Sequence, residues 1–229
     1  MAITSDEAQI ELVEIVGQFV AASNLTVLAT DAAGAKWVYK AESAMSELWD
    51  FEATTLPRRE VAAYRLSEAL GFGLIPTTLL AIGPLGPGSA QRFVEADPDF
   101  DVRPLFVPEI SDDLWPLAVL DVLSNNADRK LGHLLREDGR LWAIDNGLTF
   151  HAHPKLRTVL WGLAGRRIPQ TVLAQVADLA ERLDSDLGFG PLLDESSLSA
   201  LHARVRSLLA TGVHPDPPTD RPAVPWPIW

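Results

Sequence analysis

Two acidic turns flank a short strand hairpin in the middle of the chain, and this spacing constrains the fold more than any other feature. Asp128 stands in the run Asn-Asn-Ala-Asp-Arg-Lys, and Asp145 stands in the run Ala-Ile-Asp-Asn-Gly after an apolar stretch. Between them, residues 133–136 and 140–144 are expected to form two short strands joined by a Glu-Asp-Gly turn. Because a hairpin reverses the chain, such a fold returns the two carboxylates toward one point.

Each acidic turn also has an ordinary structural interpretation. Asp128 with Arg129 can be a turn with a surface ion pair, since Asp and Asn are common turn residues. Asp145 precedes Asn-Gly, which is a strong hairpin dipeptide. Phosphoryl transfer needs the same residue types, because one carboxylate orients or deprotonates the attacking hydroxyl and another holds magnesium against nucleotide phosphates. The remaining features of the chain favour this second interpretation.

The first part of the chain has the pattern of an antiparallel sheet with one helix. A helix is expected from about Arg58 to Leu70, because Pro57 favours its start and Gly71 its end. The Gly- and Pro-rich residues 83–88 are expected to form a turn-rich link. Apolar or β-branched runs are expected to be strands, the first three as a meander, at 14–21, 25–30, 35–41, 74–82 and 90–95.

The second part of the chain has helical periodicity. Ser111 has the chemistry of an N-cap and is followed by two acidic residues, which the helix dipole favours in a first turn. This helix is expected to end near Asn125, and amphipathic helices are expected at 169–184 and 195–211. From His214 onward, many prolines favour an extended segment that is loosely packed or disordered.

The order of strands first and helices later indicates an α+β fold with two lobes. The expected units are a β-rich N-lobe over residues 1–95, a helical C-lobe with the acidic turns over 96–213, and a Pro-rich tail over 214–229. With 229 residues, of which 47% are apolar, the chain can bury a core in each lobe and leave a cleft between them.

Composition and missing motifs disfavour several other classes of protein. The chain has no cysteine, so it can form neither a disulfide scaffold nor a cysteine metal site. Its net charge of −12 disfavours binding to nucleic acid or to an anionic membrane, because both need clustered basic residues. No P-loop, Rossmann, serine-hydrolase or zinc-protease motif is present. Without a signal peptide or a membrane-spanning apolar run, the protein is expected to be cytoplasmic.

Lys40 and Glu60 are candidate partners around a nucleotide phosphate. Lys40 ends the third expected strand, and Glu60 lies in the first turn of the helix that follows. A Lys–Glu pair between strand and helix fixes the phosphate-binding lysine in kinases. Each residue also has a commoner interpretation, since a strand lysine often faces solvent and a first-turn glutamate often only complements the helix dipole.

Basic residues near the acidic turns are further candidates. His133 lies five residues after Asp128, where a second metal ligand or a phosphate contact would help, although a lone histidine is more often structural. A basic group after Asp145 either binds a phosphorylated or acidic substrate or forms a solvated loop, and it contains His151, His153, Lys155 and Arg157.

Together these residues resemble one family. The chain is similar to the short actinobacterial phosphatidylinositol 3-/4-kinase-like proteins, an atypical branch of the protein kinase superfold. The resemblance implies a two-lobed kinase-like fold with ATP and Mg²⁺, or Mn²⁺, bound between the lobes. The resembling stretches are spread in order over residues 22–161: Ala22-Ser23-Asn24, Val38-Tyr39-Lys40, Leu48-Trp49-Asp50-Phe51, Arg59-Glu60-Val61-Ala62-Ala63-Tyr64, 83–88, Asn125-Asn126-Ala127-Asp128-Arg129-Lys130 and Lys155-Leu156-Arg157-Thr158-Val159-Leu160-Trp161.

The resemblance assigns nucleotide-binding roles by position. Lys40 matches the phosphate-binding strand lysine, and Glu60 matches the helix glutamate that pairs with it. Ser23 and Asn24 take the place of the glycine-rich phosphate loop. The hinge, whose backbone would bond adenine, matches the segment Phe93, Val94 and Glu95.

The resemblance also assigns the catalytic positions. Asp128, with Arg129, matches the catalytic Asp-Arg loop, and Asp145 matches the metal-binding aspartate. His133 stands where lipid kinases place a metal-binding asparagine, and Asn146 stands where phenylalanine is usual. Because hard cations prefer oxygen ligands, the histidine implies a single metal, a metal other than magnesium, or weak catalysis.

These expectations lead to a functional hypothesis. The protein is expected to be an ATP- and Mg²⁺-dependent phosphotransferase that acts on a protein hydroxyl or a soluble polyol. Two alternatives stay open: an ATP-binding pseudokinase with a regulatory role, and a kinase-fold enzyme that transfers AMP. Nucleic acid and membranes are not expected partners.

Overall fold

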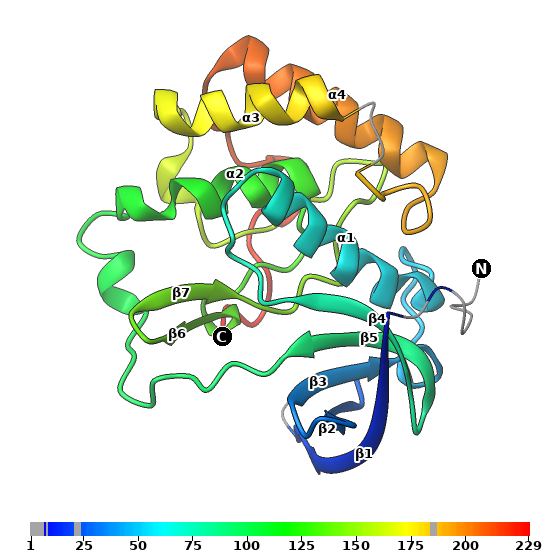
Figure 1. Ribbon diagram of the computed structural model, residues 1–229. Helices are drawn as coiled ribbons and strands as arrows, with labels where there is room; N and C mark the ends of the chain where they lie inside the picture. Colours follow the sequence, from blue (N-terminus) through cyan, green and yellow to red (C-terminus); the bar gives the residue numbers. More distant parts are fainter. Residues whose placement is uncertain (1–6, 8, 21–23, 184–186) are drawn as a thin grey trace.

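The computed structural model describes residues 7, 9–20, 24–183 and 187–229. Five strands close into a barrel at one end of the molecule, and the longer helices lie to one side of it (Figure 1). The order in the barrel is β1-β2-β3-β5-β4, with antiparallel neighbours except where β1 and β4 pair in parallel. The strands are β1 (Ile10–Gln18), β2 (Thr26–Asp31), β3 (Lys36–Ala41), β4 (Thr78–Gly83) and β5 (Gly86–Arg92).

The antiparallel meander expected in the first part of the chain is confirmed, but its closure into a barrel was not predicted. The closing pair joins Ile10 with Ala81 and Glu11 with Ile82. The barrel interior is apolar, so its burial from water stabilises the closed form. The buried side chains inside are Leu12, Val27, Ala29, Tyr39, Ala41, Ala81 and Ala90.

The connection between β4 and β5 is tighter than the sequence suggests. The expected link over 83–88 is wrong in part, because Gly83 pairs with Gly86 in a hairpin and β5 already begins there. At Gly88, an added Cβ would lie 2.2 Å from the backbone oxygen of Lys40, so only glycine fits. Glycine therefore lets β5 lie directly beside the strand that carries Lys40.

The helical part of the molecule is built around α2. Helix α1 contacts β4 and β5, and α2 contacts both α1 and α4. Helices α3 and α4 lie farthest from the barrel (Figure 1). The helices expected at 58–70, 169–184 and 195–211 differ from the observed bounds by no more than two residues at either end, whereas the helix expected directly after Ser111 begins only at Trp115. The observed bounds are α1 (Leu56–Ala69), α2 (Trp115–Ser124), α3 (Gln170–Arg182) and α4 (Glu195–Thr211).

The α2 helix begins after a short 3-10 turn at Asp112–Leu114, which Ser111 caps by accepting a hydrogen bond from the Asp113 amide at 3.2 Å. Its face is apolar and packs into the main core together with α1, α3 and α4. Among the described residues, the structure contains no helix with the length and hydropathy needed to cross a bilayer.

The expected hairpin between the acidic turns is confirmed. Strands β6 (Leu134–Glu137) and β7 (Arg140–Ala143) form a separate two-stranded sheet. The Ala143 amide donates a hydrogen bond of 2.8 Å to the Leu74 carbonyl, just before β4. This bond holds the hairpin against the edge of the barrel, so the end of β7 is delivered to the same region as β3.

The Pro-rich tail has no regular secondary structure, as expected, and most of its residues are exposed, but its start is packed more tightly than predicted. His214 is 1% exposed and lies edge-on to the rings of Trp115 and Trp161. Further along, the Ile228 carbonyl accepts a hydrogen bond of 2.8 Å from the Leu131 amide. Proline lacks a backbone N–H donor, but every residue keeps its carbonyl as an acceptor. Tail carbonyls such as that of Ile228 accept hydrogen bonds from other parts of the chain.

Candidate functional site

A cavity of about 480 Å³ lies where the barrel meets the β6–β7 hairpin. The barrel contributes Val38 and Lys40 from β3, and the segment after the hairpin contributes Ile144 and Asp145. The rest of its lining includes Phe19, Asn24, Thr26, Gln91, Arg92, Phe93, Val94, Lys130, Gly132, His133, Leu135 and Trp229. The end beside Phe93, which bonds Lys36 at the start of β3, is mainly apolar and aromatic apart from Arg92, and the other end carries Lys40 and Asp145.

Lys40 is held at the charged end by two carboxylates from distant parts of the chain. Its Nζ lies 2.5 Å from Glu60 Oε1 and 2.7 Å from Asp145 Oδ1. Burial lowers the pKa of Lys40, but the charges of Asp145 and Glu60 outweigh burial, and the pKa is raised above its usual value. The lysine is therefore a fixed cation that points into the cavity.

Glu60 does more than neutralise the lysine. Its side chain is buried in α1, and its Oε2 accepts a hydrogen bond of 2.9 Å from the Asn146 amide. The helix glutamate thus joins β3 to the segment that follows β7. This contact explains why the carboxylate of Asp145 is presented to Lys40 rather than to solvent alone.

Asp145 is the more accessible of the two carboxylates. Its side chain is 51% exposed, and its backbone has a positive φ of 58°, which turns the chain sharply after β7. The charge of Lys40 lowers the pKa of Asp145 despite the opposing effect of burial. Asp145 is therefore ionised at neutral pH and can offer oxygen ligands to a cation.

His133 lies beside Asp145, as its candidate role requires. Its Nε2 is 3.4 Å from Asp145 Oδ2, and its Nδ1 is buried with no hydrogen-bond partner among the described residues. Burial lowers the pKa of His133 to about 4, so the imidazole is neutral at neutral pH. A neutral imidazole leaves the negative charge of Asp145 uncompensated from this side.

Asp128 reaches the cavity through a neighbour. It is not among the residues that line the cavity, but its Oδ2 lies 3.0 Å from the Nζ of Lys130, which does line it. Burial raises the pKa of Asp128, and the charge of Asp145 adds to the effect. The Asp128 amide donates a 2.9 Å hydrogen bond to Asn126 Oδ1, which fixes the loop. The structure thus brings Asp128 and Asp145 into one electrostatic group.

Arg129 has a different place from the one its catalytic assignment implies. Its side chain is 0% exposed and does not line the cavity that holds Lys40. The guanidinium donates to Asp121 Oδ1 at 3.1 Å, to the Ile144 carbonyl at 3.0 Å and to Asn146 Oδ1 at 2.6 Å. Arg129 therefore cannot meet a substrate and is placed to hold the two acidic turns together from behind.

The expected hinge residues differ in what their backbones can offer. Phe93 and Val94 line the cavity, whereas Glu95 does not. The Phe93 amide donates to the Lys36 carbonyl at 3.1 Å, and the Glu95 amide donates to Glu137 Oε1 at 2.7 Å. Among the described residues, nothing bonds the amide or the carbonyl of Val94, so this residue is the one whose backbone is available to a ligand.

The expected phosphate loop lies only partly within the described residues. Ser23 lies outside them. Asn24 lines the cavity, and its Oδ1 accepts a hydrogen bond of 2.7 Å from the Ser46 amide. This bond ties the start of β2 to the chain that follows β3.

The basic group after Asp145 is engaged in contacts within the chain. Lys155 Nζ lies 2.7 Å from Asp50 Oδ2, and Arg157 Nε donates to the Ala127 carbonyl at 2.7 Å. Asn125 Nδ2 donates to the carbonyls of His151 and His153 at 2.8 Å each. These contacts fix the segment against the Asp128 loop, with Lys155 paired to Asp50 and Arg157 bonded to a backbone carbonyl.

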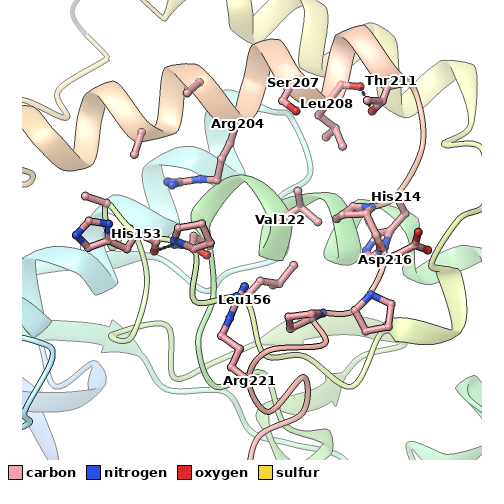
Figure 2. Close-up of a pocket in the computed structure, with 18 of the residues that line it drawn as sticks. Val122, His153, Leu156, Arg204, Ser207, Leu208, Thr211, His214, Asp216 and Arg221 are labelled. Carbon is pink, nitrogen blue, oxygen red and sulfur yellow. Dashed lines mark hydrogen bonds between the residues drawn. The ribbon is translucent and has the colours of Figure 1, made fainter.

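A second and larger cavity, of about 1150 Å³, lies between α4 and residues 213–221 (Figure 2). Arg204 from α4 and Arg221 from the tail both line it. Of the candidate residues, only His153 is part of its lining. This cavity therefore stands apart from the lysine and carboxylates that could handle a phosphate.

Two residues of the site, Asp121 and Trp229, were not predicted from the sequence. Asp121 is a fully buried acid in the apolar helix α2, and it bonds Arg129, Asn126 and Thr158. An acid in an otherwise apolar helix is a signal that could have revealed it, because buried charges are paired. Trp229 lines the cavity from the tail, and nothing in the sequence pattern indicates that contact.

The chain is similar in sequence to a mycobacterial protein. No family model matches the chain. Protein Rv2133c of Mycobacterium tuberculosis (strain ATCC 25618 / H37Rv) is 37% identical over 256 residues, which cover 94% of this chain and 91% of the relative. The alignment thus covers nearly all of both chains.

Solved structures with a similar fold are kinases. The Helicobacter pylori proinflammatory kinase CtkA matches with a TM-score of 0.53 and 12% identity, over 90% of this chain and 93% of that chain. The Golgi casein kinase matches with a TM-score of 0.50 and 13% identity, over 89% of this chain and 71% of that chain, and its structure with Mn/ADP bound also matches. The chain therefore has an α+β fold with kinase-like neighbours, although these matches do not single out the phosphatidylinositol kinase branch.

Proposed function

The chain belongs to the same family as protein Rv2133c of Mycobacterium tuberculosis. From its site and its kinase-like fold, we propose that it is an ATP- and Mg²⁺-dependent phosphotransferase of atypical kinase type. We propose a phosphatidylinositol 3-/4-kinase-like site that acts on a protein hydroxyl or a soluble polyol. The observation that carries the proposal is the meeting of Lys40, Glu60 and Asp145 at the charged end of one cavity.

Three properties of that group support phosphate handling. Lys40 is a fixed cation at one end of the cavity, and the other end is mainly apolar. This arrangement suits a nucleotide, whose phosphates are charged and whose base is flat. Glu60 binds the lysine and a backbone amide at once, so the cation keeps its position when a ligand arrives. Kinases use the same strand-lysine and helix-glutamate pair.

The residues present fit magnesium held mainly by a nucleotide. Mg²⁺ is usually bound through one or two carboxylates together with substrate phosphates. Asp145 offers an ionised, half-exposed carboxylate, whereas His133 offers nitrogen, which hard cations disfavour. Within the described part of the chain, no group of three or more His, Cys, Asp or Glu is arranged to cage a metal by itself. We therefore assign Asp145 as the main protein ligand.

The remaining roles follow from the placement of each side chain. When bound, ATP with Mg²⁺ supplies the phosphoryl group and neutralises its charge. Lys40 holds the phosphates, and Asp128 takes the proton of the attacking hydroxyl. The raised pKa of Asp128 suits that role, because a general base works best when its pKa is nearer the working pH. Arg129 and Asp121 hold the loop in place.

At the apolar end, we assign the adenine contact to the backbone of Val94 rather than to that of Glu95. The Val94 backbone groups are unbonded among the described residues, whereas the Glu95 amide already donates to Glu137. Val38 from β3 and Leu135 from β6 line the same cavity and would pack on the two faces of the base.

The proposal is tested by single-turnover assays with ATP labelled at the γ or the α phosphorus, against protein extract and a panel of polyols. We expect γ-label to move to an acceptor. Asp128→Asn should lose at least about a hundredfold in transfer and keep MgATP binding, because it removes only the base. Asp145→Asn should weaken magnesium-dependent binding itself. Wild-type turnover by both variants would contradict the site.

A regulatory pseudokinase is the second candidate, and His133 is the observation that favours it. Its neutral imidazole stands where a second oxygen ligand would help transfer. Tight MgATP binding without transfer of either label would support this candidate. Transfer of the α-label would instead support movement of AMP.

A further inference from the structure

The last described residues of the chain return to the nucleotide cavity. We call residues 222–229 the strap; its end lies close to the β6–β7 hairpin in Figure 1. Trp229 lines the cavity together with Lys40 and Asp145. Its side chain is 59% exposed, so the indole is only partly occupied by contacts within the chain. A large aromatic side chain with free surface thus stands at the mouth of the proposed nucleotide site.

Two anchors fix the strap against the loop that carries the acidic turn. The Ala223 carbonyl accepts hydrogen bonds from the Thr158 amide at 3.1 Å and from the Trp161 indole at 2.7 Å. Nearer its end, the Ile228 carbonyl accepts from the Leu131 amide at 2.8 Å. The strap is therefore bonded at both ends, and its last residues cannot move independently of residue 131.

The strap packs closely on the loop beside the second anchor. An added Cβ on Gly132 would lie 3.3 Å from the carbonyl carbon of Trp229, which is tighter than ordinary contact. Only the small residue lets the two backbones approach this closely. The position of the indole is thus set by the same loop that presents Lys130 and His133 to the cavity.

The first anchor connects the strap to the buried ion pair. The Thr158 hydroxyl donates to Asp121 Oδ2 at 3.0 Å, and Asp121 pairs with Arg129. Arg129 in turn bonds Asn146, next to Asp145. The strap therefore belongs to the same bonded network that holds the two acidic turns, which makes it part of the site's framework.

The opposite side of the cavity mouth is also aromatic. Phe19 follows β1, and its ring centroid lies 6.4 Å from that of Phe93. Both line the cavity from the barrel, whereas Trp229 lines it from the hairpin side. Aromatic faces near the rim favour a flat, polarisable group, and a purine offers more area to an indole than a pyrimidine does.

We propose that Trp229 is a nucleoside-binding residue that packs on the base or ribose of a purine nucleoside triphosphate and selects it over a bare polyphosphate. This inference rests on the proposed function. The backbone of Trp229 packs on Gly132, between Lys130 and His133, so the proposal assigns only the partly exposed indole to the nucleoside.

The test measures binding of MgATP and of magnesium tripolyphosphate by isothermal titration calorimetry. Trp229→Ala should weaken MgATP binding by about tenfold, through lost aromatic contact, and leave tripolyphosphate binding unchanged. Trp229→Phe should recover most of the ATP affinity. Trp226→Ala is the matched control, because Trp226 lies on the same strap, is 90% exposed and does not line the cavity. It should bind both probes as wild type does.

Two outcomes would overturn the inference. An unchanged ATP affinity in Trp229→Ala would show that the indole does not touch the nucleoside. An equal loss for ATP and tripolyphosphate would show that it only supports the fold. Titration of Lys40→Met in parallel distinguishes failure of the Trp229 inference from failure of the proposed function. If Lys40→Met binds ATP as wild type does, the proposed function fails and the inference with it; if Lys40→Met loses ATP while Trp229→Ala keeps it, only the inference fails.

Discussion

Glu60 illustrates how much one buried side chain can decide. Its two carboxylate oxygens serve different partners, Lys40 on β3 and the amide of Asn146 after β7. A carboxylate accepts on both oxygens, whereas an amide offers only one acceptor. The position of the cavity's cation thus depends on the charge of a residue that no ligand touches.

At this scale we predict that Glu60→Gln weakens MgATP binding by roughly tenfold or more, because hydrogen bonds to charged groups are worth about 1.5–3 kcal/mol. A fluorescent ATP analogue titrated against the variant measures the effect. Glu68→Gln is the control, since Glu68 lies exposed on the same helix. Equal affinities for the two variants would show that the lysine keeps its position without its partner.

At the scale of elements, the buried pair of Asp121 and Arg129 joins helix α2 to the acidic turns. Asp121 comes from α2, and it also accepts from Thr158 at 3.0 Å. Both partners are almost fully buried, with side chains 1% and 0% exposed. A buried charge without a partner is costly, so loss of either residue should destabilise the contact between α2 and the acidic turns.

We predict that Asp121→Asn lowers the free energy of unfolding by about 3–5 kcal/mol, because it leaves the guanidinium of Arg129 uncompensated. Urea denaturation followed by circular dichroism measures this quantity. Asp99→Asn serves as the control on an exposed loop and should change stability by less than about 0.5 kcal/mol. A loss below about 1 kcal/mol in Asp121→Asn would show that the loop has another support.

The elements also show which parts of the fold the sequence predicts. The three strands of the meander, the hairpin and the helices follow from local periodicity, and the structure has them. Barrel closure depends on Ile10 meeting Ala81, a pairing that no local pattern encodes. Likewise, the composition of the tail indicates few donors, but it does not indicate where the carbonyls of Ala223 and Ile228 bind.

The candidate site divides in the same way. The spacing of Asp128 and Asp145 around a hairpin suggested their convergence, but only Asp145 lines the cavity, and Asp128 is connected to it through Lys130. The burial of Arg129 was not predicted, because its partner Asp121 lies in an apolar helix and the sequence does not show that the two residues meet. Glu95 was placed at the hinge by resemblance, but its amide is already bonded by Glu137. Such competing partners become visible only once distant segments are packed.

At the scale of the whole molecule, the tail connects the helical part to the cavity that holds Lys40, and His214 is buried at its start. Burial lowers the pKa of His214, against smaller opposing effects of the hydrogen bond to Pro215 and of the charge of Asp216. Its Nδ1 lies 2.9 Å from the Pro215 carbonyl and so carries the proton. The folded state thus holds a neutral imidazole between two tryptophan rings.

This burial predicts a pH dependence. As the pH falls through about 6.5, the unfolded chain takes up a proton that the folded chain refuses, so stability is lost on acidification. One such group changes the free energy of unfolding by at most about 1.4 kcal/mol per pH unit. His214→Phe should therefore lose less stability than wild type between pH 7.5 and pH 5.5, measured by urea denaturation. An equal loss in both would show that His214 is protonated in the folded state.

Amide hydrogen exchange with and without MgATP tests the central claim most directly, because it compares the two cavities in one measurement. We predict slower exchange at residues 92–95, 128–133, 143–147 and the strap, the segments that surround Lys40 and Asp145. Residues 196–211, which border the larger cavity, should exchange as before. Slower exchange at 196–211 and none around Lys40 would place the nucleotide elsewhere and contradict the account.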